Sequence, residues 1–267
     1  MQQSLAILAG AGALPVALAR GAPGAAYVTF AGMGAEVPAG VRHLPARMER
    51  LGDMFAALRA AGVREVVFAG AMHRPHFDTD RLDRLTAELM PGLAAAMQQG
   101  DDALLRHVVA MFERQGLRVR APQDVAPELL AGPDLALGRS PDAAAQADAR
   151  RGLDILGALS PLDLGQAVVV EAGLCLGVES IQGTDALLRF VAATPGHLRR
   201  GAGVLVKTAK QGQDLRIDLP TIGPGTVEGV ARAGLAGLFV GAGQVLVVDR
   251  ERVARLVADH DLFLVAL

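Results

Sequence analysis

The chain has 267 residues, 51% of them hydrophobic, which suits one large domain or two small ones with well-filled cores. The net charge of −2, the lack of Trp and the single Tyr27 exclude a basic, aromatic nucleic-acid surface. No run approaches the ~20 apolar residues of a membrane-spanning helix, and Gly and Pro interrupt the apolar segment 5–18. The single cysteine, Cys175, excludes an intramolecular disulfide, and its leucine neighbours predict a buried structural thiol. We therefore expect a cytoplasmic protein.

The first half alternates short β-branched runs with helical stretches, a pattern typical of βαβ units. The expected strands are Leu5–Ala9, Ala26–Phe30, Glu65–Ala69 and Leu117–Arg120. The expected helices are Leu14–Arg20, Met48–Ala61, Leu82–Gln98 and Asp101–Gln115. Pro91-Gly92 should kink or split the third helix. Residues 1–130 are thus predicted to form a Rossmann-like amino-terminal domain.

The second half has a different order of elements. Prolines and glycines gather before Pro141, which predicts a linker over residues 131–141. The expected strands are Gln166–Glu171, Leu174–Glu179, Val204–Lys207, Gly237–Val240, Val245–Val248 and Phe263–Ala266, the first two as a hairpin. The expected helices are Asp142–Leu159, Thr184–Ala192, Thr226–Ala233 and Arg250–Ala258. Residues 142–267 are thus predicted to form a second, mixed α/β domain.

Two loops follow predicted strands of the first half. Gly10, Ala11 and Gly12 form a small turn before a helix, where backbone N–H groups and the helix dipole can bind a phosphate. A tight turn without a ligand explains the same residues equally well, and no ribose-binding acid follows the second strand. After the third strand, Arg74 can bind phosphate, whereas its neighbour His73 is more typical of a solvated loop.

Two acidic clusters stand at predicted helix starts. Asp101 and Asp102 serve either as helix-terminal charges or as ligands of a substrate hydroxyl or metal. In the second cluster a strand end, a glycine turn and a helix start bring together Glu179, Gln182, Gly183, Thr184 and Asp185. Carboxylates in such a cluster suit Mg²⁺, although capping by Asp185 and an ion pair of Glu179 with an arginine are the alternative.

The only two lysines, Lys207 and Lys210, precede the acidic turn that contains Asp218. Diphosphate chemistry needs cations that neutralise phosphoryl oxygens and a carboxylate that holds a metal or activates water. A surface turn with weak salt bridges is the alternative. The pattern alone does not separate these two interpretations.

Together these segments resemble the LpxI-type UDP-2,3-diacylglucosamine diphosphatases of Gram-negative bacteria. The matching motifs, in chain order, are Leu8–Pro15, Ala69-Gly70 with Arg74-Pro75, Gly100–Arg106, Gly138–Pro141, Asp163–Gln166, Glu179 with Gln182–Asp185, Asp218–Gly223 and Ala233–Gly237. The resemblance implies two domains with the site between them and hydrolysis of the UDP-sugar lipid to UMP and 2,3-diacylglucosamine 1-phosphate (lipid X), a step of lipid A synthesis.

The resemblance also assigns roles. It implies Asp218 as the catalytic residue and a divalent metal such as Mg²⁺, with Mn²⁺ as the other candidate. Thr221 of the same motif is a further candidate substrate contact. Asp218, Glu179 and Asp185 are the expected metal ligands. The lipid substrate implies a peripheral contact with the cytoplasmic face of the inner membrane, and a homodimer is one expected oligomeric state. The alternatives are another nucleotide-sugar hydrolase or transferase, and a nucleotide-sugar or lipid-binding protein that does not cleave its ligand.

Overall fold

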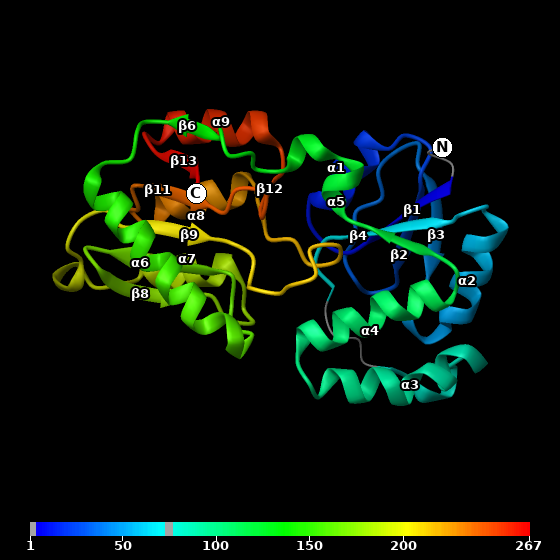
Figure 1. Ribbon diagram of the computed structural model, residues 1–267. Coiled ribbons are helices and arrows are strands. Elements are labelled where there is room, and N and C mark those ends of the chain that lie inside the picture. Colours follow the sequence, from blue (N-terminus) through cyan, green and yellow to red (C-terminus); the bar gives the residue numbers. More distant parts are fainter. Residues whose placement is uncertain (1–3, 73–76) are drawn as a thin grey trace. The chain divides into compact units, whose positions relative to one another are not determined.

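The computed structural model describes residues 4–72 and 77–267, which divide into two compact units. The first unit comprises Met1–Glu128 together with the short segment Asp214–Asp218. The second unit comprises Leu129–Gln213 and Leu219–Leu267. Each unit has its own sheet, and both sheets are visible in Figure 1.

The first unit contains a five-stranded sheet in the order β3-β2-β1-β4-β5, and its neighbouring strands are all parallel. These strands are β1 (Leu5–Ala9), β2 (Ala26–Phe30), β3 (Arg42–Ala46), β4 (Glu65–Ala69) and β5 (Arg118–Arg120). The chain runs outward from β1 in both directions, so the order reverses between β1 and β4. The expected Rossmann-like sheet is confirmed, and this reversal is where such sheets bind ligands.

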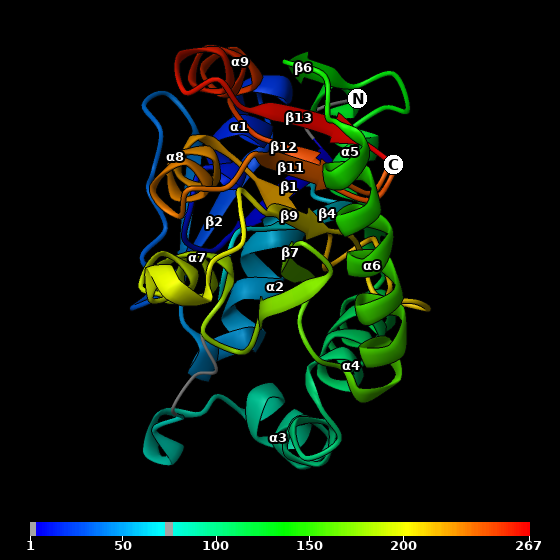
Figure 2. The ribbon, with the colours of Figure 1, turned by 90° about the vertical axis from the view of Figure 1, so that its left-hand side faces the viewer.

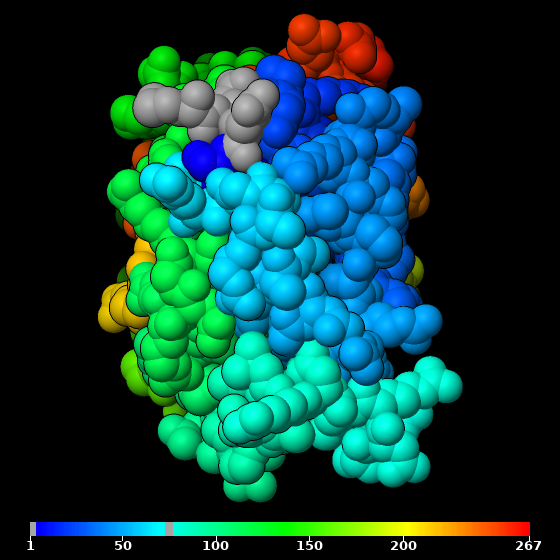
Figure 3. All heavy atoms as spheres, turned by 90° about the vertical axis from the view of Figure 1, so that its right-hand side faces the viewer, coloured from blue at the N-terminus to red at the C-terminus, as the bar shows by residue number. Residues whose placement is uncertain are grey.

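Helices cover both faces of this sheet. Those of the unit are α1 (Leu14–Gly21), α2 (Leu51–Ala60), α3 (Arg84–Met97), α4 (Asp101–Arg114) and α5 (Pro122–Val125). α2 and α4 bury Phe55 and Phe112 against the sheet in one apolar cluster, whereas α1 and α5 contact β1 and β4. α3 packs on α4 and continues through Pro91, so the predicted split does not occur. In Figure 3 the turquoise side chains of α3 form the lower edge of the visible face.

Strand β3 was absent from the prediction. Its sequence carries Arg42, His43 and Pro45, a polar composition that masks a strand. Charged residues and proline are tolerated, and even favoured, on a sheet edge because they discourage pairing with another chain. The position of β3 at the end of the sheet order explains this composition.

The second unit contains a six-stranded mixed sheet in the order β6-β13-β11-β9-β7-β8. These strands are β6 (Ala136–Gly138), β7 (Ala167–Glu171), β8 (Leu174–Val178), β9 (Val204–Lys207), β11 (Gly237–Val240) and β13 (Phe263–Ala266). β9, β11 and β13 are parallel, and β7 and β8 form the predicted hairpin. A separate parallel pair, β10 (Thr221–Ile222) and β12 (Leu246–Val247), includes part of the predicted strand 245–248.

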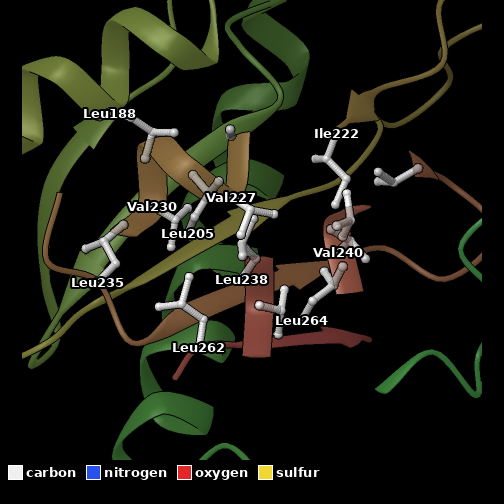
Figure 4. Packing of buried hydrophobic residues seen from close by; sticks show 14 of the residues in the cluster. Leu188, Leu205, Ile222, Val227, Val230, Leu235, Leu238, Val240, Leu262 and Leu264 are labelled. Atoms are coloured by element: carbon white, nitrogen blue, oxygen red, sulfur yellow. The ribbon is translucent and has the colours of Figure 1, made fainter. Parts of the chain in front are cut away.

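Alternate side chains of this sheet face two helical layers. The helices are α6 (Ala143–Leu159), α7 (Thr184–Ala192), α8 (Pro224–Arg232) and α9 (Arg250–Asp259). α6 covers one face through Ala149 and Leu156, and α7, α8 and α9 cover the other, as Figure 2 shows. Leu188 of α7, Val230 of α8 and Leu238 of β11 belong to the apolar cluster on this second face (Figure 4). Successive side chains of each strand point to opposite faces of the sheet, and each helix places its apolar stripe on one of these faces. The second unit therefore has three layers, with the sheet between α6 and the other helices, which agrees with the predicted mixed α/β domain.

Cys175 is exposed, so the prediction of a buried thiol was wrong. It lies on β8, which has a strand neighbour on one side only, and the adjacent Leu174 is also exposed. Leucine neighbours predict burial in a central strand but not at an edge.

The segment predicted as a linker, residues 131–141, contains β6, which pairs antiparallel with β13 of the second unit. Across the described residues, no helix has the length and apolar character needed to cross a bilayer.

Candidate functional site

The loops after β1 and β4 meet at the reversal of strand order in the first unit. Ala11 and Ala71 exchange backbone hydrogen bonds of 2.8 and 2.9 Å, and the Gly10 N–H donates to the Ala69 carbonyl at 2.8 Å. A Cβ on Gly10 would overlap the Ala71 carbonyl oxygen, and a Cβ on Gly70 would lie 2.5 Å from the Ala11 carbonyl oxygen. Two of the glycines are therefore required by the approach of the two loops.

Gly12 differs from these glycines. Its φ of +101° belongs to the region that favours glycine, yet no atom lies within 4 Å of the place its Cβ would occupy. It is exposed just before the first turn of α1. The contact between the loops after β1 and β4 accounts for Gly10 and Ala11. It does not account for the positive φ of Gly12, the third residue predicted to bind phosphate here. Arg74 and His73 lie outside the described residues.

α4 begins with the predicted acidic pair. Gly100, with φ +110°, precedes the helix, and Asp101 and Asp102 form its first turn. The Asp102 carboxylate is paired with Arg106 one turn later. This pairing suits a helix start, where the dipole favours negative charge.

The segment Asp214–Asp218 forms a compact turn within the first unit. The N–H groups of Ile217 and Asp218 donate to the Asp214 carbonyl at 3.2 and 3.3 Å. The Arg216 guanidinium binds both oxygens of the Asp214 carboxylate, with its Nε 2.9 Å from Oδ1 and its Nη2 2.6 Å from Oδ2. It also donates from Nη1 to Oε1 of Glu113 on α4 at 3.0 Å. One arginine thus closes the turn and connects it to a helix.

Electrostatics around this turn follow from those contacts. The hydrogen bond from Arg216 lowers the pKa of Asp214 below its ordinary value, and Arg106 of α4 adds to the effect, although burial opposes it. The same bond raises the pKa of Arg216. Ile217 packs against the apolar cluster of the first unit. The turn therefore brings Asp218 into the unit that also carries Asp101 and Asp102.

In the second unit, polar residues gather where β8 and β9 end. Lys207, the last residue of β9, is only 5% exposed. Its Nζ donates to Thr184 Oγ1 at 2.6 Å and to Glu179 Oε2 at 3.3 Å. Glu179 accepts two further bonds, from Thr184 Oγ1 at 3.0 Å and from the Gln166 N–H at 3.3 Å. Four residues from separate elements thus form one hydrogen-bonded cluster, which we call the Lys207 cluster.

The amino terminus of α7 belongs to this cluster. Gly183, with φ +82°, precedes the helix, and Thr184 and Asp185 begin it. Gln182 and Asp185 are exposed beside it. Unpaired N–H groups at a helix start attract anions, and the ammonium of Lys207 adds positive charge. The structure therefore brings Lys207 together with the predicted residues Glu179, Gly183 and Thr184.

Other predicted residues of this unit lie in separate contacts. Lys210 pairs with Asp163. Thr221 lies on β10, and its hydroxyl donates to the Leu219 carbonyl at 3.2 Å. The hydroxyl of Thr208, next to Lys207, contacts Gln244 at 2.5 Å. Thr208 lies within the candidate segment from Lys207 to Lys210, but its contact with Gln244 is not predicted by the sequence, because the two residues are 36 positions apart and share no motif.

Carboxylate oxygens are suitable donors for Mg²⁺, but the predicted ligands have different surroundings. Asp218 belongs to the first unit, whereas Glu179 and Asp185 belong to the second. Within the described residues, no group of three or more His, Cys, Asp and Glu side chains is arranged as a metal site. The bonds made by Glu179 favour a role as partner of Lys207 over a role as a ligand.

Comparison with known proteins defines the class of this chain. Residues 4–129 match the LpxI N-terminal domain and residues 133–265 match the LpxI C-terminal domain. The chain belongs to the LpxI family. It is 40% identical, over 99% of its length and 98% of the relative's, to the UDP-2,3-diacylglucosamine pyrophosphatase LpxI of Caulobacter vibrioides (strain ATCC 19089 / CIP 103742 / CB 15).

Proposed function

We propose that this protein hydrolyses UDP-2,3-diacylglucosamine to UMP and 2,3-diacylglucosamine 1-phosphate, as a step of lipid A synthesis. The observation that carries the proposal is the 40% identity to a pyrophosphatase of that substrate, which extends over 99% of the chain. In the reaction the oxygen of water forms a bond to one phosphorus, the bond from that phosphorus to the bridging oxygen breaks, and two phosphomonoesters leave.

We assign the catalytic role to Asp218. Its backbone is held in the turn that Asp214 and Arg216 close, and Ile217 anchors that turn in an apolar cluster. A carboxylate fixed in this way can orient water or hold a divalent cation, Mg²⁺ or Mn²⁺. When bound, such a cation would neutralise charge on the phosphate oxygens. Ligand roles for Asp185 and Glu179 remain predictions.

The Lys207 cluster is proposed to bind a phosphate group. The first turn of α7, which begins at Thr184, offers backbone N–H donors, whereas the Gly183 N–H already donates to the Ser180 carbonyl at 2.9 Å. Gln182 is exposed beside this turn. Lys207 contributes a cation that the Glu179 carboxylate keeps in place, at 3.3 Å. Lys210, Thr221, Gly10, Ala11, Gly12, Asp101, Asp102 and Arg74 remain candidate substrate contacts.

A glycolipid nucleotide substrate also has consequences for location. Acyl chains remain in a bilayer unless a protein covers them, so we propose a peripheral contact with the cytoplasmic face of the inner membrane. A homodimer is proposed as the oligomeric state to be tested by sedimentation.

The test is turnover of UDP-2,3-diacylglucosamine by the purified chain with Mg²⁺, with UMP and the lipid phosphate detected by mass. Asp218→Asn should lower turnover by about 10²–10⁴-fold, the range expected for a lost acid–base or metal-holding group. Asp154→Asn, an exposed position on α6, is the matched control and should keep full activity. Full activity of Asp218→Asn would refute the catalytic role assigned to Asp218. Binding of the lipid without UMP release by the wild type would support a non-catalytic binding protein instead.

A further inference from the structure

Five residues of the second half of the chain belong to the first unit. The segment Asp214–Asp218 is preceded by Gln213 and followed by Leu219, both of the second unit. Such a short segment has little apolar surface that can pack against the first unit. Ile217 is the residue of the segment that packs against the apolar cluster of that unit. Its polar contacts must therefore contribute to holding it.

Arg216 makes those polar contacts in two directions. Within the segment, its N–H and its Nε donate to Asp214 Oδ1 at 3.0 and 2.9 Å. Beyond the segment, its Nη1 reaches Glu113 on α4 at 3.0 Å, across 103 positions of the sequence. The planar fork of a guanidinium can bind two carboxylates at once, which a lysine ammonium cannot do with the same geometry.

We propose that Arg216 is a positioning residue for Asp218, acting by fastening the segment 214–218 to α4 through Glu113. The inference rests on the catalytic role proposed for Asp218, which is two positions away. Loss of the fastening leaves the folded unit intact but lets the segment leave its docked position, so that Asp218 is less often in the reactive arrangement. A misplacement of about 1 Å at a reacting group can cost 10²-fold in rate.

This role differs from that of an ordinary surface ion pair. Arg216 and Glu113 are 44% and 47% exposed, so their pair contributes little to global stability. The expected effect is local, because the segment needs only a few contacts to change from docked to undocked. Arg84 and Glu88, paired at 2.9 Å on α3, provide a matched comparison without any connection to the segment.

The experiment compares Glu113→Gln with Glu88→Gln in the full chain. Glu113→Gln should lower kcat by about two- to fivefold, the largest shift that the loss of one exposed ion pair can produce, with less change in KM, whereas Glu88→Gln should leave both unchanged. Arg216→Lys should recover part of the kcat that Arg216→Gln loses. Equal kinetics of Glu113→Gln and the wild type would overturn the proposal.

A second measurement does not depend on the activity. Glu113→Gln keeps the Arg216–Ile217 peptide bond, which trypsin can cut only when the segment is undocked. Cleavage after Arg216, detected by mass, should be several-fold faster in Glu113→Gln than in Glu88→Gln. An unchanged rate would refute the fastening even if the wild type hydrolysed no lipid. If cleavage is faster in Glu113→Gln but the wild type has no diphosphatase activity, the attachment of the segment to α4 is supported and only the proposed function is refuted.

Discussion

Lys207 and Glu179 form an ion pair with 3.3 Å between Nζ and Oε2, and their side chains are only 6% and 13% exposed. Charges withdrawn from water are costly to leave without a partner. Lys207 ends β9 and Glu179 follows β8. The ion pair therefore connects two chain segments that already belong to one sheet.

The first prediction concerns this pair. Lys207→Met should lower the free energy of unfolding by ~3 kcal/mol, the lower end of the range for buried pairs, because Glu179 is only partly buried and would remain there without its cation. The double variant Lys207→Met/Glu179→Gln should lose less than the sum of the two single variants. Urea unfolding of the four proteins measures the coupling. The exposed pair Arg252–Glu228, at 3.2 Å, is the control and should couple by less than ~1 kcal/mol. Additive effects at Lys207 and Glu179 would contradict the prediction.

The second prediction separates the glycines of the amino-terminal loop. Gly10→Ala should be severely destabilising, by more than ~3 kcal/mol, because its Cβ would overlap the Ala71 carbonyl oxygen and the two loops would have to separate. Gly12→Ala meets no atom and carries only the strain of its positive φ, about 1–2 kcal/mol. Urea unfolding distinguishes the two. A loss of activity in folded Gly12→Ala would indicate that a ligand approaches the backbone there, whereas equal stabilities would refute the loop-contact explanation.

The sequence predicted most of the fold because its strands are short, apolar and separated by clear turns. β1, β4 and β9 lie where periodicity places them, and the order of elements in the first half indicates a parallel sheet. β3 and β6 were missed for physical reasons. β3 has the charged, proline-containing composition of an edge, and β6 has three residues within a segment rich in proline.

The candidate sites were predicted less completely. The sequence indicated Lys207, Thr184 and Glu179 as candidates. That they meet follows from the sheet order, in which β8 and β9 flank β7 and end at the same edge, and from the start of α7 at that edge. The fastening of Arg216 to Glu113 joins residues 103 positions apart without a local motif. The sequence therefore identified chemical groups, and the tertiary fold determined which of them meet.

The third prediction concerns the divalent cation. Removal of metal with EDTA should abolish UMP release from UDP-2,3-diacylglucosamine, and excess Mg²⁺ should restore it, because phosphate oxygens and carboxylates share a hard cation. Mg²⁺ should also bind Asp218→Asn more weakly than the wild type in calorimetry, a readout independent of turnover. Undiminished turnover in EDTA would show that no dissociable metal is needed.

The fourth prediction follows from the exposure of Cys175. A maleimide should label one thiol per native chain at a rate within a few-fold of that in the denatured chain, since the side chain lies on the open edge strand β8. Labelling monitored by mass, with Cys175→Ser as the unreactive control, provides the measurement. Protection of the thiol in the native chain would show that this edge is covered in solution, as it would be in an oligomer that pairs through β8.

The last prediction is a pH dependence of stability at Glu171, which is 1% exposed. Burial raises the pKa of this carboxyl, but the Arg200 N–H, the Arg199 guanidinium at 2.7 Å and the Gly201 N–H together hold it below its ordinary value of 4.5. A lowered pKa in the folded state means that the stabilisation is fully present above the unfolded value and is lost as pH falls through the folded value.

Glu171→Gln should therefore cost stability at pH 7, by about 3 kcal/mol or more, since Arg199 loses its anion. The difference in unfolding free energy from the wild type should shrink as pH falls below about 4.5. Urea unfolding at pH 7, 5, 4 and 3 measures it, with the exposed Glu88→Gln as a control whose difference stays near zero. A difference for Glu171→Gln that stays constant down to pH 3 would show that the carboxylate titrates alike in the folded and unfolded chains, and would rule out its proposed stabilisation by Arg199.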